Sequence, residues 1–330
     1  MSANPTGTPS WILPSYQLHM LRAGMRLLAA IHPGYAATLM DRIWFAAPRR
    51  KPRETEQALL NQGSCISFDV HGQRVAAWAW GEDGPTVVLL HGWGGHAGQM
   101  SAFVAPLRQA GFRVVAFDAP AHGASANSRH GGRRVTFFEF ADALQTVTAR
   151  ESAIVGIIAH SGGCTAVSLA LRAGWKAPAN IVFVAPFAQP QHAVADFARM
   201  LGTTEEVIAS FVRKVEHWLG HPWSFLDITT LEDSHKWRRL LVIHDEQDYD
   251  VPLAQANALA DSWPSAQLVV TRGLGHRRVL RDASVVDRVL AFLCDEPTAN
   301  AARHTAHTRA DLDAAYEALV AYGSGMHAQR

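Results

Sequence analysis

Short β-branched and apolar runs alternate with helix-like segments over residues 86–293, and this alternation restricts the fold more than any other feature of the chain. The strand-like runs lie at residues 86–90, 113–117, 153–159, 181–185, 240–244 and 267–271. Helix-like segments separate them at residues 97–110, 136–150, 164–173 and 253–263, and a last one follows at 282–293. Such alternation predicts an α/β protein with a mostly parallel, doubly wound sheet and helices on both faces.

Two departures from this alternation predict the domain organisation. Residues 64–70 and 74–80 are strand-like and joined at His71-Gly72, which predicts an antiparallel hairpin at one edge of the sheet. Residues 189–238 contain no strand-like run and are too many for a loop, so they predict an inserted helical cap. We therefore expect an α/β core at 61–188 and 239–294, a cap at 189–238, an N-terminal arm and helical extension at 1–60, and a C-terminal tail with a helix at 295–330.

The N-terminal extension allows two interpretations. After a disordered arm at residues 1–15, apolar residues recur at helical spacing from Leu18 to Ile31, and Pro33-Gly34 separates them from a second helical piece. A polar, basic linker follows at residues 48–56. An apolar helix face followed by a basic cluster is typical of peripheral contact with a membrane of anionic lipids. We favour the other interpretation, a helix packed on the domain, because the basic cluster is short.

Composition excludes some classes of function. The chain has 30 Lys and Arg against 29 Asp and Glu, a net charge of +1, so no global field favours nucleic acid as a partner. The paired histidines lack neighbouring cysteines or carboxylates at metal-ligand spacing, so we expect no metal and no other cofactor. Three scattered cysteines indicate reduced thiols, and no secretory signal is visible, so we expect a cytoplasmic protein.

A serine lies at the turn between the strand-like run 153–159 and the helix-like segment 164–173. Small residues flank it in the sequence Ala159-His-Ser-Gly-Gly163, as a close approach of strand and helix requires. The sharp turn exposes the Oγ of Ser161 as a nucleophile. The N–H of Gly162, at a helix start, is a candidate donor to an oxyanion. The competing interpretation is a serine that only caps a helix.

A glycine-rich loop follows the strand-like run 86–90, with the sequence His91-Gly-Trp-Gly-Gly-His96. Glycines let backbone N–H groups face a pocket that side chains would otherwise fill. We expect the Trp93 N–H to be the second oxyanion donor and His91 to form hydrogen bonds beneath the loop. Trp93 and His160 are also expected to contact the substrate. The competing interpretation is a flexible turn between strand and helix.

An aspartate and a histidine follow the last two strand-like runs. Three aspartates come after residues 240–244, and Asp248 is favoured because it precedes a Val-Pro pair by three residues, with Asp250 and Asp245 as alternatives. His276 lies in a glycine-rich loop after residues 267–271, from which its ring can reach Ser161. A carboxylate on Nδ1 would fix the tautomer of this general base. The glycine-rich loop, the serine turn, the aspartate segment and the histidine loop each follow the end of a strand-like run. This shared placement argues against a chance occurrence of the four motifs.

Together these segments resemble the α/β-hydrolase superfamily. The resemblance covers residues 64–293 and includes the loop Asp118-Ala-Pro-Ala-His-Gly-Ala-Ser125, in which Ala121 replaces a usual glycine, as Ala159 does in the serine motif. It implies acyl transfer: His276 takes the Ser161 proton, and Ser161 attacks a carbonyl carbon while two backbone N–H groups bind the oxyanion. A serine nucleophile argues against the aspartate-dependent dehalogenases and epoxide hydrolases of this superfamily.

A small-molecule carboxylic ester is the expected substrate, because the resemblance is mainly to esterases and lipases. Apolar side chains of the predicted cap either line an acyl pocket or pack as its core; they are Phe197, Met200, Leu201, Ile208, Phe211, Val212, Trp218 and Trp223. An acyltransferase, thioesterase or C–C bond hydrolase would use the same triad, and a non-catalytic binding protein on this fold is a further alternative. The sequence leaves the natural ester and the oligomeric state open.

Overall fold

The structure is a computed structural model that describes residues 15–295. Residues up to Phe292 belong to one compact unit, and a second unit begins at Leu293. The predicted N-terminal arm, except for Ser15, and the predicted helix of the C-terminal tail lie outside the described residues.

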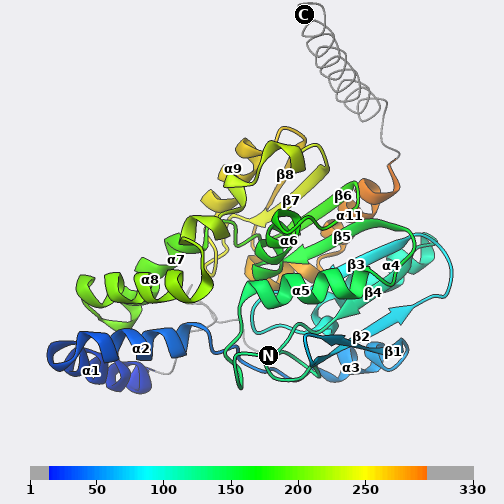
Figure 1. Ribbon diagram of the computed structural model, residues 1–330. Helices are drawn as coiled ribbons and strands as arrows, with labels where there is room; N and C mark the ends of the chain where they lie inside the picture. Colours follow the sequence, from blue (N-terminus) through cyan, green and yellow to red (C-terminus); the bar gives the residue numbers. More distant parts are fainter. Residues whose placement is uncertain (1–14, 296–330) are drawn as a thin grey trace, which may run out of the picture. The chain divides into compact units, whose positions relative to one another are not determined.

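Eight strands form one sheet in the order β1-β2-β4-β3-β5-β6-β7-β8 (Figure 1). Antiparallel pairing joins β1 to β2 and β2 to β4, and every other neighbouring pair is parallel. This sheet confirms the predicted α/β fold with a hairpin at one edge. The strands are β1 (Ser64–Val70), β2 (Gln73–Trp80), β3 (Thr86–Leu90), β4 (Arg113–Phe117), β5 (Ile154–His160), β6 (Asn180–Val184), β7 (Arg239–Asp245) and β8 (Ala266–Thr271).

Helices cover both faces of the sheet. α5 (Phe137–Thr148) and α6 (Gly162–Arg172) lie on one face, and α4 (Val104–Gln109) and α11 (Ala283–Cys294) lie on the other (Figure 1). α9 (Leu253–Ser262) packs beside β7 and β8. Because the central strands are covered on both faces, they are apolar at nearly every position instead of alternating, and all five residues of β3 are buried.

Two segments differ from the sequence-based expectation. The predicted helix at 97–110 is a 3₁₀ helix, η1 (Ala97–Phe103), followed by the short α4, since Pro106 lacks an N–H and its ring clashes with the preceding turn of a continuous α-helix. The predicted linker at 48–56 contains the start of a helix, α3 (Glu54–Leu60). Its first turn is stabilised by Glu56, whose Oε2 accepts a hydrogen bond from the Arg53 N–H at 2.8 Å.

The insertion between β6 and β7 packs against the N-terminal helices. It contains α7 (Pro190–Leu201), α8 (Glu205–Leu219) and three 3₁₀ turns, η2 (Trp223–Leu226), η3 (Ile228–Thr230) and η4 (Asp233–His235). α1 (Ser15–Ile31) and α2 (Pro33–Trp44) form a hairpin that lies beside α7 and α8 (Figure 1). No helix within residues 15–295 is long and apolar enough to cross a bilayer.

Aromatic rings fill the contact between the hairpin and the insertion. The Trp44 ring lies edge-on to Phe197 at 5.0 Å and to Trp223 at 5.6 Å, centroid to centroid. Phe45 meets Trp218 at 5.0 Å, with the guanidinium of Arg134 3.3 Å from the Trp218 ring centre. These side chains of the insertion therefore pack as a core against α2, which favours the second of the two roles considered for them.

Candidate active site

Ser161, His276 and Asp248 form one hydrogen-bonded line. His276 Nε2 lies 3.0 Å from Ser161 Oγ, and His276 Nδ1 lies 2.7 Å from Asp248 Oδ2. A carboxylate can only accept here, so Nδ1 carries the proton and Nε2 is free to accept the serine proton. The structure thus brings together three of the residues singled out in the sequence, from the carboxyl ends of β5, β7 and β8.

Ser161 occupies a strained turn between β5 and α6. Its φ of 51° and ψ of −121° are unusual for a residue other than glycine and cost on the order of 1–3 kcal/mol. Backbone hydrogen bonds hold this conformation: the Ser161 N–H donates to Val184 O at 3.0 Å, and its carbonyl accepts from Cys164 and Phe187. Gly163 allows the start of α6 to approach the backbone at His91 closely, because a Cβ on Gly163 would lie 2.6 Å from the His91 carbonyl oxygen.

The three aspartates after β7 have separate contacts. Asp248 Oδ2 meets His276, and its Oδ1 accepts from the N–H groups of Asp250 and Val251 at 2.8 and 2.9 Å. Asp245 instead accepts from the Leu274 N–H at 2.9 Å and from Thr271 Oγ1, so it ties the loop before His276 to the end of β7. Of these three carboxylates, that of Asp248 is therefore the one hydrogen-bonded to the His276 ring.

The pKa of Asp245 lies below its usual value. Burial alone raises this pKa, but the hydrogen bonds that the carboxylate accepts, first from Gly275 and Leu274, outweigh burial. Asp245 is thus held as a carboxylate that fixes the loop preceding His276.

Two backbone N–H groups belong to segments next to Ser161. Gly162 is the first residue of α6, so its N–H has no acceptor within the helix. The loop at residues 91–96 passes directly over the serine, because a Cβ on Gly92 would lie 2.8 Å from Ser161 Cβ. Within residues 15–295 no backbone carbonyl accepts from the Trp93 or Gly162 N–H. In the described part of the chain, the two N–H groups predicted as oxyanion donors are therefore not engaged by backbone carbonyls.

Two buried histidines hold the loop that carries Trp93. His91 Nδ1 donates to Gly92 O at 2.7 Å, and its Nε2 accepts from the Ala119 N–H at 3.0 Å. His122 Nδ1 donates to Pro120 O, and its Nε2 accepts from the Gly94 N–H at 2.9 Å. Each ring must be neutral to accept. Burial, the largest effect, lowers the pKa of His91 to about 4 and that of His122 to about 3.

Two more buried histidines hold the other side of the site. His160 Nε2 donates to the backbone carbonyl of His276 at 2.9 Å, and His244 Nε2 donates to Val251 O at 2.9 Å, next to Asp248. Burial lowers the pKa of both rings. The structure thus places His160, with 4% of its surface exposed, in contact with His276. Several of the many histidines of the chain are hydrogen-bonded to backbone groups and hold the loops around Ser161 in place.

Comparisons with known sequences indicate the family of the chain. A family model described as serine aminopeptidase, S33 matches residues 82–239, and one described as TAP-like protein matches residues 221–304. The chain belongs to the α/β-hydrolase superfamily. Membership supports a hydrolase as the class of enzyme. No curated protein matches this hydrolase in sequence.

Solved structures share the hydrolase fold at low sequence identity. A putative lipase from Acinetobacter baumannii AYE has a TM-score of 0.54 and 17% identity, over 73% of this chain and 93% of that chain. An esterase from Exiguobacterium antarcticum has a TM-score of 0.54 and 14% identity, over 71% and 100%. A membrane phospholipase A described as a bacterial virulence factor has a TM-score of 0.54 and 17% identity, over 84% and 96%.

Two aromatic residues that the sequence analysis did not single out, Phe137 and Phe187, lie near the serine of this hydrolase. Phe137 lies on Gly162, where a Cβ would be 2.5 Å from the ring. The Phe137 ring lies 5.5 Å from Trp93 and 6.3 Å from Phe187, centroid to centroid. All three are half-buried and form an apolar wall beside Ser161. Phe187 was detectable in principle because it follows the end of β6, another carboxyl strand end.

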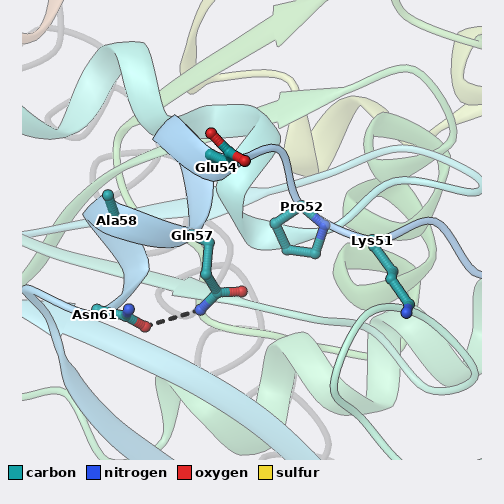
Figure 2. Close-up of a pocket in the computed structure, with 6 residues that line it drawn as sticks. All are labelled: Lys51, Pro52, Glu54, Gln57, Ala58 and Asn61. Carbon is teal, nitrogen blue, oxygen red and sulfur yellow. Dashed lines mark hydrogen bonds between the residues drawn. The ribbon is translucent and has the colours of Figure 1, made fainter.

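Two hollows lie outside this cluster. One of 500 Å³ runs along α3 and is lined by Lys51, Pro52, Glu54, Gln57, Ala58 and Asn61 (Figure 2). Gln57 Nε2 donates to Asn61 Oδ1 there at 2.8 Å, and the lining contains no nucleophile paired with a base (Figure 2). The second hollow is smaller and strongly basic. Within residues 15–295 no group of three or more histidine, cysteine or carboxylate side chains is arranged to hold a metal ion.

Proposed function

We propose that the protein is a serine hydrolase that cleaves a carboxylic ester through a Ser161–His276–Asp248 triad. The observation that carries this proposal is the hydrogen-bonded line from Asp248 through His276 to Ser161 Oγ, with the serine on a strained turn. A serine is a weak nucleophile unless an adjacent base takes its proton, and this geometry supplies such a base.

In the acylation half, His276 Nε2 removes the Oγ proton as Oγ bonds to the carbonyl carbon of the ester. The Trp93 and Gly162 N–H groups donate to the oxyanion, which is worth about 3 kcal/mol per donor. Asp248 stays ionised and stabilises the imidazolium through Nδ1. His276 then donates the proton to the leaving alcohol, and the acyl group remains on Ser161.

In the deacylation half, water takes the place of the alcohol. His276 Nε2 removes a water proton as the oxygen attacks the acyl carbon, and the same two N–H groups bind the second oxyanion. Collapse of this intermediate returns the proton to Ser161 Oγ and releases the carboxylic acid. No group beyond these residues is required for either half.

Two observations support an ester with an apolar acyl group. The wall of Trp93, Phe137 and Phe187 lies beside the nucleophile and suits an apolar chain. Structural relatives include proteins described as an esterase, a putative lipase and a phospholipase. A relative described as a thioesterase domain shares the fold as well, so thioesters belong in the same substrate panel.

The test is labelling with a fluorophosphonate probe, read by intact mass. The wild-type protein is expected to gain one adduct, and Ser161→Ala and His276→Ala are expected to gain none. Ser168→Ala is the matched control, since Ser168 is a buried serine of α6 that donates to Thr165 O. Failure of the folded wild type to react, or labelling that persists in Ser161→Ala, would overturn the proposal. Hydrolysis of thioesters but not esters would reassign the substrate.

A further inference from the structure

The smaller of the two hollows concentrates positive charge in a nearly neutral protein. Its volume is 110 Å³, enough for a few water molecules at about 30 Å³ each and too little for an acyl chain. Five cationic residues line it against one carboxylate, that of Glu56; they are Arg50, Lys51, Arg53, Arg277 and Arg281. The whole chain has a net charge of only +1, so this local excess is a property of the hollow.

The single carboxylate is already engaged. Glu56 Oε1 lies 2.7 Å from Arg281 Nη2, and its Oε2 accepts the Arg53 N–H at 2.8 Å and lies 3.7 Å from His96 Nε2. It therefore joins the two walls, from residues 50–56 and 277–281, and does not neutralise the hollow. The cationic side chains of the hollow still repel one another. The pKa of Arg277 is lowered, first by burial and next by the positive charge of Arg50, although the negative charge of Asp250 acts in the opposite direction.

The hollow adjoins the candidate active site. Arg277 directly follows His276 in α10 (Gly275–Arg278). Gln99, another lining residue, lies against the loop that carries Trp93, because a Cβ on Gly95 would be 2.7 Å from Gln99 Oε1. His96, the residue immediately before η1, forms part of the lining too. An anion bound there would lie next to the two segments that hold the base and an oxyanion donor.

We propose that this hollow binds one carboxylate or phosphate group of a ligand, and that this group is carried by the ester substrate itself. Guanidinium groups pair with both kinds of oxyanion through two parallel N–H donors, so several arginines around a small hollow suit either. The substrate class is thus an ester with an anionic end. This assignment rests on the proposed function, whereas binding of an anion to the hollow does not.

The kinetic test compares two 4-nitrophenyl esters of equal chain length, one ending in a methyl group and one in a carboxylate. In Arg50→Gln/Arg53→Gln, the ratio of kcat/KM for the anionic to the neutral ester is expected to fall about tenfold, which corresponds to about 1.4 kcal/mol. Arg199→Gln/Arg213→Gln removes the same charge from α7 and α8 and is expected to keep the wild-type ratio. An unchanged ratio in the first variant would overturn the substrate assignment.

A binding test separates this inference from the proposed function. Inorganic phosphate is titrated calorimetrically into Ser161→Ala, which cannot turn over an ester, with and without the two Arg→Gln changes. Binding that is lost with Arg50→Gln/Arg53→Gln supports the anion site even if no ester is hydrolysed. In the wild-type protein, phosphate that inhibits hydrolysis of the anionic ester only supports the substrate as the source of the bound anion. Phosphate that alters turnover of the neutral ester would overturn the substrate as the source and show that the hollow binds a separate anion from solution. Absence of binding in both proteins overturns the site.

An independent observation concerns the outer face of α1. Tyr16, Met20, Leu27 and Ile31 are 64%, 72%, 64% and 63% exposed, although all are large and apolar. At 100° per residue they fall within a sector of about 60°, so they form one stripe, opposite the buried Met25. The helix hairpin of α1 and α2 contains one carboxylate, Asp41, which is buried and paired with Arg134 at 2.9 Å. Its exposed charges are therefore all positive.

We propose that this stripe lies on the surface of a membrane that contains anionic lipid. The stripe contains one tyrosine, Tyr16, and the exposed arginines of the hairpin are Arg26 and Arg42. An exposed apolar helix face on a hairpin with cations and no exposed carboxylate suits the headgroup region, where the apolar side chains insert and arginines contact phosphates. The proposal replaces our preference for a helix that is merely packed on the domain, because packing leaves this face uncovered within residues 15–295.

The test is flotation with vesicles of phosphatidylcholine alone or with phosphatidylglycerol. The full chain is expected to float with the anionic vesicles, and Met20→Glu/Leu27→Glu is expected to stay unbound. Trp237→Glu/Val270→Glu is the matched control, since these residues are 47% and 48% exposed outside α1. A wild-type chain that ignores both vesicles would overturn the proposal. The proposal would also be overturned if the wild type were a dimer and the α1 variant a monomer that floats as well as the wild type. The stripe would then be a contact between two copies of the chain.

Discussion

The Nε2–H of His160 donates a hydrogen bond to the backbone carbonyl of His276 at 2.9 Å. The two rings lie 4.8 Å apart, and the pKa of His160 is held well below its usual value by burial, followed by the proximity of His276. One neutral ring thus connects the strand that ends at the nucleophile with the turn that carries the base.

Replacement of His160 by alanine is expected to lower kcat by about 10- to 100-fold with little change in KM, because a displaced base is misaligned with Ser161. His160→Gln keeps an N–H donor at a similar reach and is expected to retain most of the activity. Steady-state kinetics on one ester decide between two roles. A rise in KM at constant kcat would instead favour the role expected from the sequence, a contact between His160 and the substrate.

Asp248→Asn is expected to lower kcat by about 10⁴-fold, since an amide stabilises the wrong tautomer of His276. Asp250→Asn preserves the backbone N–H that donates to Asp248 and is expected to stay within about threefold of wild type. The measurement is kcat for both variants at one pH, with folding checked by circular dichroism. A larger loss in Asp250→Asn would show that the orienting carboxylate has been assigned to the wrong residue.

Gly162→Ala is expected to lower kcat by about 100-fold, because the new Cβ would lie 2.5 Å from the Phe137 ring and shift an oxyanion donor. Phe137→Ala in the same chain removes the clash and should restore part of the loss. The double-mutant cycle measures this coupling directly. Additive losses in the cycle would mean that Phe137 does not limit the position of the Gly162 N–H.

Acid is expected to destabilise the protein through His91 and His122. Their pKa values of about 4 and about 3 in the folded state lie below the unfolded value of about 6.5. As the pH falls from 6.5 toward 4, the unfolded state binds more protons, so the free energy of unfolding decreases. This stabilisation is complete above pH 6.5, and each ring contributes up to about 1.4 kcal/mol per pH unit to its loss.

Urea unfolding at several pH values between 4 and 7.5 measures this slope. His122→Asn removes one of the two groups and is expected to flatten the slope. His71, which is 62% exposed in its side chain, provides the control as His71→Asn and should leave the slope unchanged. Equal slopes in wild type and His122→Asn would contradict burial as the cause.

The fold was predictable because its signals are local. β1, β3 and β4 begin and end where expected, since runs such as 86–90 are buried on both faces and leave no helical period. The residues of the candidate site were found because each lies just beyond a strand end. The structure also explains why related loops have a glycine where this chain has Ala121. Ala121 has a φ of 64°, a conformation that glycine adopts without strain.

Contacts between distant segments were not predictable. The sequence alone does not reveal that His122 accepts from Gly94, or that Phe137 covers Gly162, because no periodicity connects loops 25 to 30 residues apart. The basic hollow is a stronger case, since Arg281 and Glu56 lie 225 positions apart. The beginning of α3 was missed because its first turn lies in a segment dominated by proline and charge.

The segment between α2 and α3 crosses the loops of the candidate site. A Cβ on Gly94 would lie 2.6 Å from Pro48, and Arg49 donates to the carbonyls of Ala121 and Ser125. A recombinant fragment that starts at β1 would therefore keep every residue of the proposed triad but lose the segment that packs over the loop at residues 91–96. The segment between α2 and α3 should therefore be kept in any shortened protein, and poor turnover of a fragment that lacks it would say nothing against Ser161.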